Sequence, residues 1–179
     1  MRLALFPRLS RRKATIEALY GAIVAQARKP VFYLECGVPD TVNGRFEMIL
    51  LHGGLLLDRL AGEAALRPLG QGVFDRFCQD MDDTLRERGV SDLKVPREMK
   101  RVGEAFYGRQ AAYRAALDAP EPAALVEALR RNLYAVGPAT AENHGVERMA
   151  AYIREAAENL RRQDAAGLAA GRLVWPDLV

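Results

Sequence analysis

The sequence predicts an all-α protein, a single domain built as a bundle of six or seven helices. Apolar residues recur every three or four positions along most of the 179 residues, which is the spacing of a helix buried on one side. The chain is rich in Ala, Leu, Arg and Glu, which lose little side-chain freedom on a helix. Strand-like alternation is confined to Val31–Leu34, and a chain of this length can bury a sizeable core.

The first expected helix runs from Arg12 to Ala27, where apolar residues form one stripe. Pro30 ends this helix, because a proline disfavours helical geometry in the residue before it. Residues 31–40 are then expected to form an ordered connector in which Phe32 and Tyr33 are the anchors.

The second expected helix extends from about Val42 to Leu60, and either Asp40 or Thr41 is suited to cap its first turn. Its apolar face is broader than a surface helix needs. The helix is therefore either central to the bundle or exposes an apolar strip to a partner. Gly53-Gly54 lowers its stability by about 1 kcal/mol per glycine relative to alanine, and such a pair permits a bend or a close approach of another backbone.

Two more helices are expected before a proline-rich break at residues 119–122. The third helix begins after Gly70 and ends before Gly89, a residue that suits the position after a helix C-terminus. The fourth begins at Pro96, which suits a first turn, and continues to about Leu117. Three helical segments are expected after the break: Ala123–Val136, Val146–Gln163 and the short Ala165–Leu173.

Positive charge is concentrated at the N-terminal end of the chain. Residues 1–30 hold seven basic groups and one acid, a net charge of +6, whereas the remaining 149 residues hold 19 basic and 22 acidic groups, a net charge of −3. The expected basic patch consists of Arg8, Arg11, Arg12, Lys13, Arg28 and Lys29. Such a patch favours lipid headgroups, ribosomal RNA or an acidic protein surface, and a solvated helix start is the alternative. Sequence-specific nucleic-acid binding is not expected, because no zinc-finger or RNA-recognition signature is present.

The two cysteines, Cys36 and Cys78, do not make a disulfide framework, which indicates a reducing compartment. Cys78 is expected to be buried, and Cys36, beside a turn, to be partly exposed. Neither histidine is close enough in sequence to activate Cys36 as a nucleophile.

Neither a membrane span nor a secretory signal is expected. The longest apolar run, Met48–Leu57, is shorter than the roughly 20 residues that a span needs. The N-terminal residues MRLALFPRLSRRK lack an apolar stretch before their charges.

Asp80, Asp82 and Asp83 form the one cluster that suggests an enzyme. An all-helical, magnesium-dependent enzyme of isoprenoid or quinone metabolism places several carboxylates about one turn apart around one ion. Here only Asp80 and Asp83 share a helix face, and no second acidic motif follows. The alternative is a solvated acidic face on which Arg86 pairs with Asp82 or Asp83.

The histidines do not predict a metal site or a cofactor. A di-iron helical bundle requires Glu-x-x-His pairs, whereas His144 and Glu147 occur in the reverse order, with His144 expected in a loop. His52 lies on or near the broad apolar face of the second helix, where a hydrogen-bonded histidine is more common than a ligand. We therefore assign no catalytic, cofactor-binding or metal-binding residue.

Aromatic, methionine and arginine side chains interleave between residues 33 and 109. Methionine adapts to irregular surfaces, and tyrosine combines an apolar ring with a polar tip. If several of these residues line an exposed groove they suit a helical apolar client, and plain core packing is the alternative. The candidate partner-binding residues are Tyr33, Arg45, Phe46, Met48, Met81, Met99, Tyr107 and Arg109. A polar network between helices is also expected to join Asp75 with Arg109 or Arg45.

The same region carries a specific resemblance to a known family. The matching segments are IVAQAR-P-FY, GVPDTVNGRFEMI-LH, FD-F-QDMDD-LRE-GV-DL-VP--MK and EAFYGR--AY, between about Tyr20 and Leu117. In these segments the chain resembles the ubiquinol–cytochrome c chaperone family of cytochrome bc1 assembly factors. The resemblance divides the single domain into a family-like core of about residues 20–118 and a helical extension of about residues 121–179.

The resemblance implies an all-helical, non-enzymatic assembly chaperone for the cytochrome bc1 complex (respiratory complex III) that binds newly made cytochrome b and needs no cofactor. Family members often act with a small assembly partner, and mitochondrial members bind near the ribosomal exit. The compact length and the absence of an obvious organelle presequence look more like a bacterial member. For such a member the cytoplasm and the inner face of the membrane are expected, whereas eukaryotic relatives are mitochondrial.

Overall fold

The computed structural model describes residues 5–135 and 143–178, with side chains for residues 10–135 and 144–178. All regular structure in this part of the chain is helical, which confirms the all-α prediction. The elements are α1 (Leu5–Ala27), α2 (Pro30–Leu34), α3 (Val42–Ala61), α4 (Arg67–Glu87), α5 (Val95–Asp118), α6 (Ala123–Leu129), the π-helical turn η1 (Arg130–Tyr134), α7 (Asn143–Arg162) and α8 (Ala165–Ala169). Because α2 and α8 are only five residues long, six longer helices make up the described bundle.

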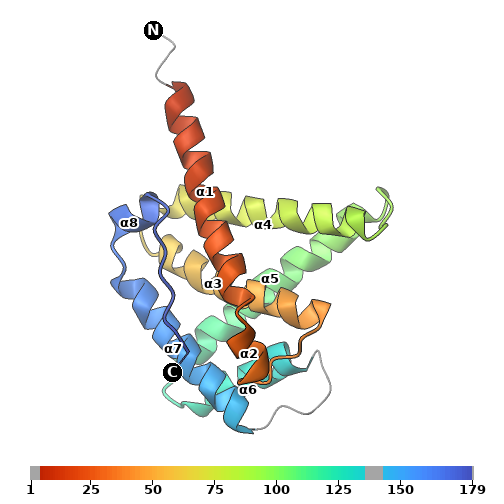
Figure 1. Cartoon of the computed structure of the whole chain (residues 1–179), viewed down its shortest axis with the longest axis vertical. Coiled ribbons are helices and arrows are strands. Elements are labelled where there is room, and N and C mark those ends of the chain that lie inside the picture. The colour runs from red at the N-terminus through yellow and green to blue at the C-terminus, as the bar shows by residue number, and fades with distance from the viewer. Residues whose placement is uncertain (1–4, 136–142, 179) are drawn as a thin grey trace.

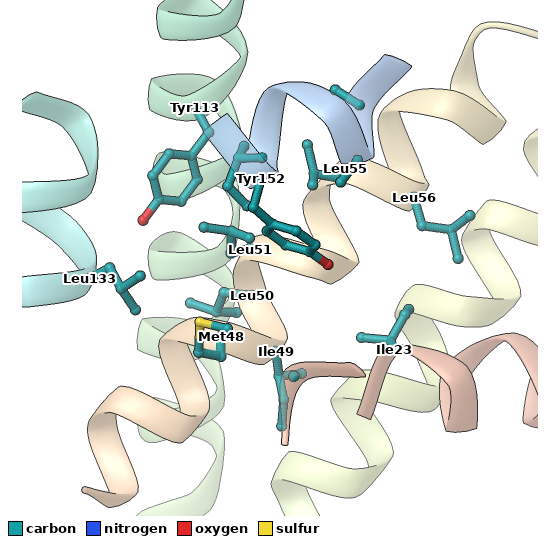
Figure 2. Packing of buried hydrophobic residues seen from close by; sticks show 14 of the residues in the cluster. Ile23, Met48, Ile49, Leu50, Leu51, Leu55, Leu56, Tyr113, Leu133 and Tyr152 are labelled. Carbon is teal, nitrogen blue, oxygen red and sulfur yellow. The ribbon is translucent and has the colours of Figure 1, made fainter. Parts of the chain in front are cut away.

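The helix α3 lies at the centre of the bundle, as the breadth of its apolar face predicts. It packs against α1, α4, α5, α7 and η1 (Figure 1). Figure 2 shows its side chains, from Met48 to Leu56, among residues from four of these neighbours: Ile23, Tyr113, Leu133 and Tyr152. Burying one leucine side chain contributes roughly 1.5–3 kcal/mol, so the leucines of α3 contribute much of the stability of the core.

The starts of three helices differ from the expected positions. The helix α1 begins at Leu5, before the expected Arg12, and its first turns extend beyond the other helices (Figure 1). The helix α4 begins at Arg67, because a proline in the first turn, here Pro68, removes no helical hydrogen bond. His144 lies in the first turn of α7 and not in a loop.

One expected helix cap is confirmed, and one expected helix ends differently. Thr41 caps α3, with its hydroxyl accepting a hydrogen bond from the Gly44 amide at 3.0 Å, as one of the two expected caps. The expected helix Ala123–Val136 changes to a π-helical turn after Leu129, and its last residue, Val136, lies outside the described residues.

The prediction for the two cysteines is wrong in both cases. Cys36 is buried and Cys78 is half-buried. The turn that holds Cys36 is covered by η1 and α7, since Tyr134 donates a hydrogen bond to the Cys36 carbonyl oxygen at 2.8 Å and Gly145 packs against the same peptide. Burial raises the pKa of both thiols, which disfavours the thiolate that a nucleophile requires.

His52 is fully buried, and each of its ring nitrogens has a partner, which confirms the prediction of a hydrogen-bonded histidine. Its Nδ1 lies 2.8 Å from the Met48 carbonyl oxygen and must donate, because a carbonyl oxygen only accepts. Its Nε2 therefore accepts from the Tyr152 hydroxyl at 2.9 Å, and that hydroxyl accepts from the Gln26 amide at 2.9 Å. The extended C-terminal residues cover this network, with Trp175 packed edge-on against the imidazole.

We predict that the His52 network makes the fold sensitive to acid. Burial lowers the pKa of His52 to about 4, below the value of about 6.5 expected in the unfolded chain. The unfolded chain therefore binds the extra proton first, and stability is lost as the pH falls from about 6.5 toward 4, by on the order of 3 kcal/mol in total. Urea titrations of the parent protein and of His52→Gln between pH 7 and 4.5 check this. Parallel pH profiles for the two proteins would refute it.

The glycine pair of α3 faces α5 at ordinary packing distance. A Cβ on Gly54 would lie 3.6 Å from the Gln110 side chain, and one on Gly53 would lie 3.5 Å from the Phe106 ring. The spacing between α3 and α5 would therefore also accommodate alanine at both positions.

We predict that Gly54→Ala stabilises the protein by about 0.5–1 kcal/mol, because alanine is the better helix former and its methyl group has room. The matched control is Gly145→Ala, whose Cβ would lie 2.6 Å from the Cys36 carbonyl oxygen and should destabilise the fold. Denaturant midpoints of the two variants should move in opposite directions. A lower midpoint for Gly54→Ala contradicts the packing described here.

Candidate functional site

An open groove of about 330 Å³ lies where α1, α3, α4 and α5 meet. Its apolar lining consists of Val42, Phe46, Ile49, Met81, Leu85 and Val102. The α3 residues are spaced by four and three positions and those of α4 by four, so each set lies on one side of its helix. Val42, the first residue of α3, is 61% exposed, so its side chain is open to a partner lying on the groove.

The groove exists because α4 and α5 extend past the helices that cover their inner halves. Figure 1 shows the two helices reaching to a joining loop at the edge of the molecule. Nearer the centre, aromatic rings from α3, α4 and α5 fill the space between these helices. The ring centroids of Phe46 and Phe77 are 6.4 Å apart, and those of Phe77 and Phe106 are 5.2 Å apart. Toward the loop no such rings follow, and Met81 and Leu85 are left half-buried.

A second hollow of about 200 Å³ continues the groove past α2. Its lining includes Tyr33 and Leu34, together with Arg28 and Arg45, which border both hollows. Leu34 is 82% exposed. Tyr33 is half-buried, with its hydroxyl donating to the Ala27 carbonyl oxygen at 2.7 Å. We call the two hollows together the α3–α4 groove.

Three arginines and two aspartates border the α3–α4 groove: Arg28, Arg45 and Arg88, with Asp40 and Asp80. Arg45 donates to Asp40 at 2.6 Å, and this hydrogen bond holds the pKa of the Asp40 carboxyl below its usual value. The one acid in the lining of the larger hollow, Asp80, accepts a hydrogen bond from the Tyr20 hydroxyl at 2.7 Å. Burial, and then this bond, raises the pKa of Tyr20, so the tyrosine stays a neutral donor.

The structure brings four of the eight predicted partner-binding residues to the groove: Tyr33, Arg45, Phe46 and Met81. Met48 is fully buried in the core, so we omit it from the candidate surface. Arg109 is also omitted, because it lies outside the lining of both hollows and its guanidinium is paired with Glu47. Met99 and Tyr107 lie on α5 outside the lining of both hollows.

The expected link between Asp75 and Arg109 or Arg45 is wrong. Asp75 is exposed and accepts a hydrogen bond from Gln71 on its own helix, at 2.7 Å. Arg109 instead joins α5 to α3 through two hydrogen bonds to Glu47, at 2.9 and 3.0 Å.

The basic residues of the N-terminal thirty fall into two groups at opposite ends of α1. Arg11, Arg12 and Lys13 are exposed near its start, whereas Arg28 and Lys29 follow its end. From Lys13 to Arg28 the rise of a helix, about 1.5 Å per residue, separates the two groups by about 22 Å. Arg28 borders the α3–α4 groove and Lys29 pairs with Asp177 at 3.1 Å. The side chain of Arg8 lies outside the described residues.

The acidic residues of α4 do not converge. Asp80 accepts from Tyr20, Asp82 pairs with Arg86 at 2.6 Å as the solvated-face interpretation predicts, and Asp83 is exposed. Within residues 5–135 and 143–178, no three carboxylate, histidine or cysteine groups lie close enough to share a metal ion. The geometry therefore gives no support to the magnesium-dependent alternative.

None of the helices in the described ranges is long and apolar enough to cross a membrane.

Comparisons with known proteins give one consistent family. Residues 34–175 match the family described as Ubiquinol-cytochrome C chaperone. The chain is 24% identical over 163 residues to the ubiquinol-cytochrome-c reductase complex assembly factor 1 of Xenopus laevis, covering 90% of this chain and 80% of that protein. The crystal structure of a Cbp3 homolog from Brucella abortus is similar with a TM-score of 0.86 and 40% sequence identity, covering 99% of this chain and 98% of that one.

Proposed function

Because the chain belongs to the ubiquinol–cytochrome c chaperone family, we propose that it assists assembly of the cytochrome bc1 complex by holding newly made cytochrome b without a chemical step. The observation that carries the proposal is the α3–α4 groove, an apolar hollow left uncovered in a chain of this family. The small assembly partner implied by the family resemblance stays a prediction.

The groove suits a client of this kind for a physical reason. A membrane-spanning segment that has not yet been inserted exposes apolar side chains to water. Each Å² of apolar surface buried on the protein contributes about 25 cal/mol to binding. Met81 can fit side chains of different shapes, because its unbranched chain rotates freely.

Copurification at successive stages of assembly tests the proposed function. The tagged protein should recover cytochrome b that is not yet part of the complete complex. Recovery of the mature complex in equal proportion would instead make the chain a structural subunit, and absence of cytochrome b from every fraction would refute the proposal.

We further propose that Arg11, Arg12 and Lys13 hold the chaperone at the cytoplasmic face of the inner membrane. Each basic residue near an anionic surface contributes about 1 kcal/mol of attraction, and salt screens it. Cosedimentation with phosphatidylglycerol vesicles should therefore fall when the salt concentration is raised, and in a variant with all three residues changed to Gln. Salt-insensitive cosedimentation would contradict this part of the proposal, and salt-sensitive pelleting with ribosomes alone would assign the patch to the ribosome.

A further inference from the structure

The border of the α3–α4 groove includes two arginines that have no acidic partner among the described residues. Arg28 and Arg88 line the larger hollow from the end of α1 and the end of α4. In the part of the chain that the structure describes, neither side chain makes an ion pair, whereas Arg45 is bound to Asp40. Asp80, the one acid in the lining of the larger hollow, already accepts from Tyr20 and lies 3.6 Å from Arg76.

These two cations restrict which segments the groove can hold. A helix lying on Phe46, Met81 and Leu85 would shield the neighbouring guanidinium groups from water. A purely apolar segment would leave them partly desolvated without compensation, and a basic segment would add repulsion. A carboxylate can accept two parallel hydrogen bonds from one guanidinium. An acidic segment therefore replaces the hydrogen bonds to water that the arginines lose when they are covered.

We propose that the α3–α4 groove selects an apolar helix that carries acidic side chains opposite Arg28 and Arg88. This inference rests on the proposed function, because it specifies the chemistry of the client segment. The apolar lining supplies attraction to any apolar helix, and the two arginines supply the discrimination.

Binding of model peptides to the full chain tests the inference. Three labelled peptides of about 20 residues, the length of a membrane-spanning helix, share one apolar face and carry Glu, Gln or Lys on the other face. The Glu peptide should bind at least about tenfold more tightly than the Lys peptide at low salt, with the Gln peptide between them. The ratio should shrink in high salt.

A double charge reversal identifies the residues responsible. The variant Arg28→Glu/Arg88→Glu should prefer the Lys peptide. The control Arg131→Glu/Arg161→Glu has the same change in net charge, on exposed residues of η1 and α7 outside the groove, and should keep the preference of the parent. Equal affinities for the three peptides, or an unchanged preference in the groove variant, overturn the inference.

The outcomes separate this inference from the proposed function. Charge-independent binding that competes with cytochrome b refutes the selectivity and leaves the chaperone role intact. Absence of peptide binding, in a protein that also recovers no cytochrome b, refutes both. If the charge reversal abolishes vesicle binding or self-association of the chain instead, the groove belongs to a lipid surface or to a second copy, and the inference is overturned.

Discussion

Val42→Asp should reduce capture of cytochrome b by at least about tenfold. If a carboxylate at this position pairs with Arg28 or Arg88, it takes from the acidic client a cation that lines the same hollow. If it stays unpaired, burying it under the apolar face of the client costs on the order of 2 kcal/mol or more. That cost exceeds the 1.4 kcal/mol that corresponds to a tenfold change in affinity. The fold should be unaffected, because Val42 is exposed at the first position of α3, where an acidic side chain is favoured by the helix dipole.

Leu93→Asp is the matched control for this prediction. Leu93 is an aliphatic residue at the loop between α4 and α5 and is 94% exposed, but it does not line the α3–α4 groove. Quantitative recovery of cytochrome b with each variant, with thermal unfolding as a check on folding, gives the comparison. Equal losses in the two variants, or none in Val42→Asp, would show that the groove is not the client surface.

Arg109→Ala should destabilise the protein by about 3–5 kcal/mol, the usual effect of leaving one member of a buried pair without its partner. The Glu47 side chain is only 5% exposed, so its carboxylate is left poorly hydrated and without a partner when the arginine is removed. Glu47→Gln should cost less, about 1–2 kcal/mol, because Arg109 is 29% exposed and an amide oxygen still accepts one hydrogen bond.

Denaturant unfolding of the two single variants and of the double variant Glu47→Gln/Arg109→Gln checks this asymmetry. The double variant should be more stable than Arg109→Ala, since no charge is then buried alone. Lys100→Gln is a suitable control, because Lys100 and its partner Glu104 are both exposed and the loss should be small. If Arg109→Ala is no worse than Lys100→Gln, the pair does not hold α3 and α5 together.

The helical architecture could be predicted because its signals are local. Thr41 and the apolar spacing of α3 act within a few residues, and both were sufficient to place that helix. The extent of α1 was not predictable from periodicity, because its first turns extend beyond the other helices (Figure 1), and a helix needs an apolar stripe only where it packs on a core. The burial of Cys36 depends on η1 and α7, which lie about a hundred residues further along the chain.

The candidate site was only partly visible in the sequence. Phe46 and Met81 were identified by residue type, but the same reasoning selected Met48, two positions away from Phe46 and on the buried side of α3. Arg88 gave no signal, because a charged residue at the end of a helix is ordinary on a protein surface. Its role depends on the space between α3 and α4, which only the tertiary structure shows.

Site-specific photo-crosslinking shows whether the α3–α4 groove is the surface that holds cytochrome b. A photoreactive amino acid replaces Met81 in the groove or, in a parallel protein, Leu93 at the outer loop, and the crosslinked chain is identified while cytochrome b is being made. We expect a crosslink from position 81 to cytochrome b that disappears once the complex is complete, and none above background from position 93. Crosslinks of equal yield from both positions, or none to cytochrome b from position 81, would show that the groove does not hold the client.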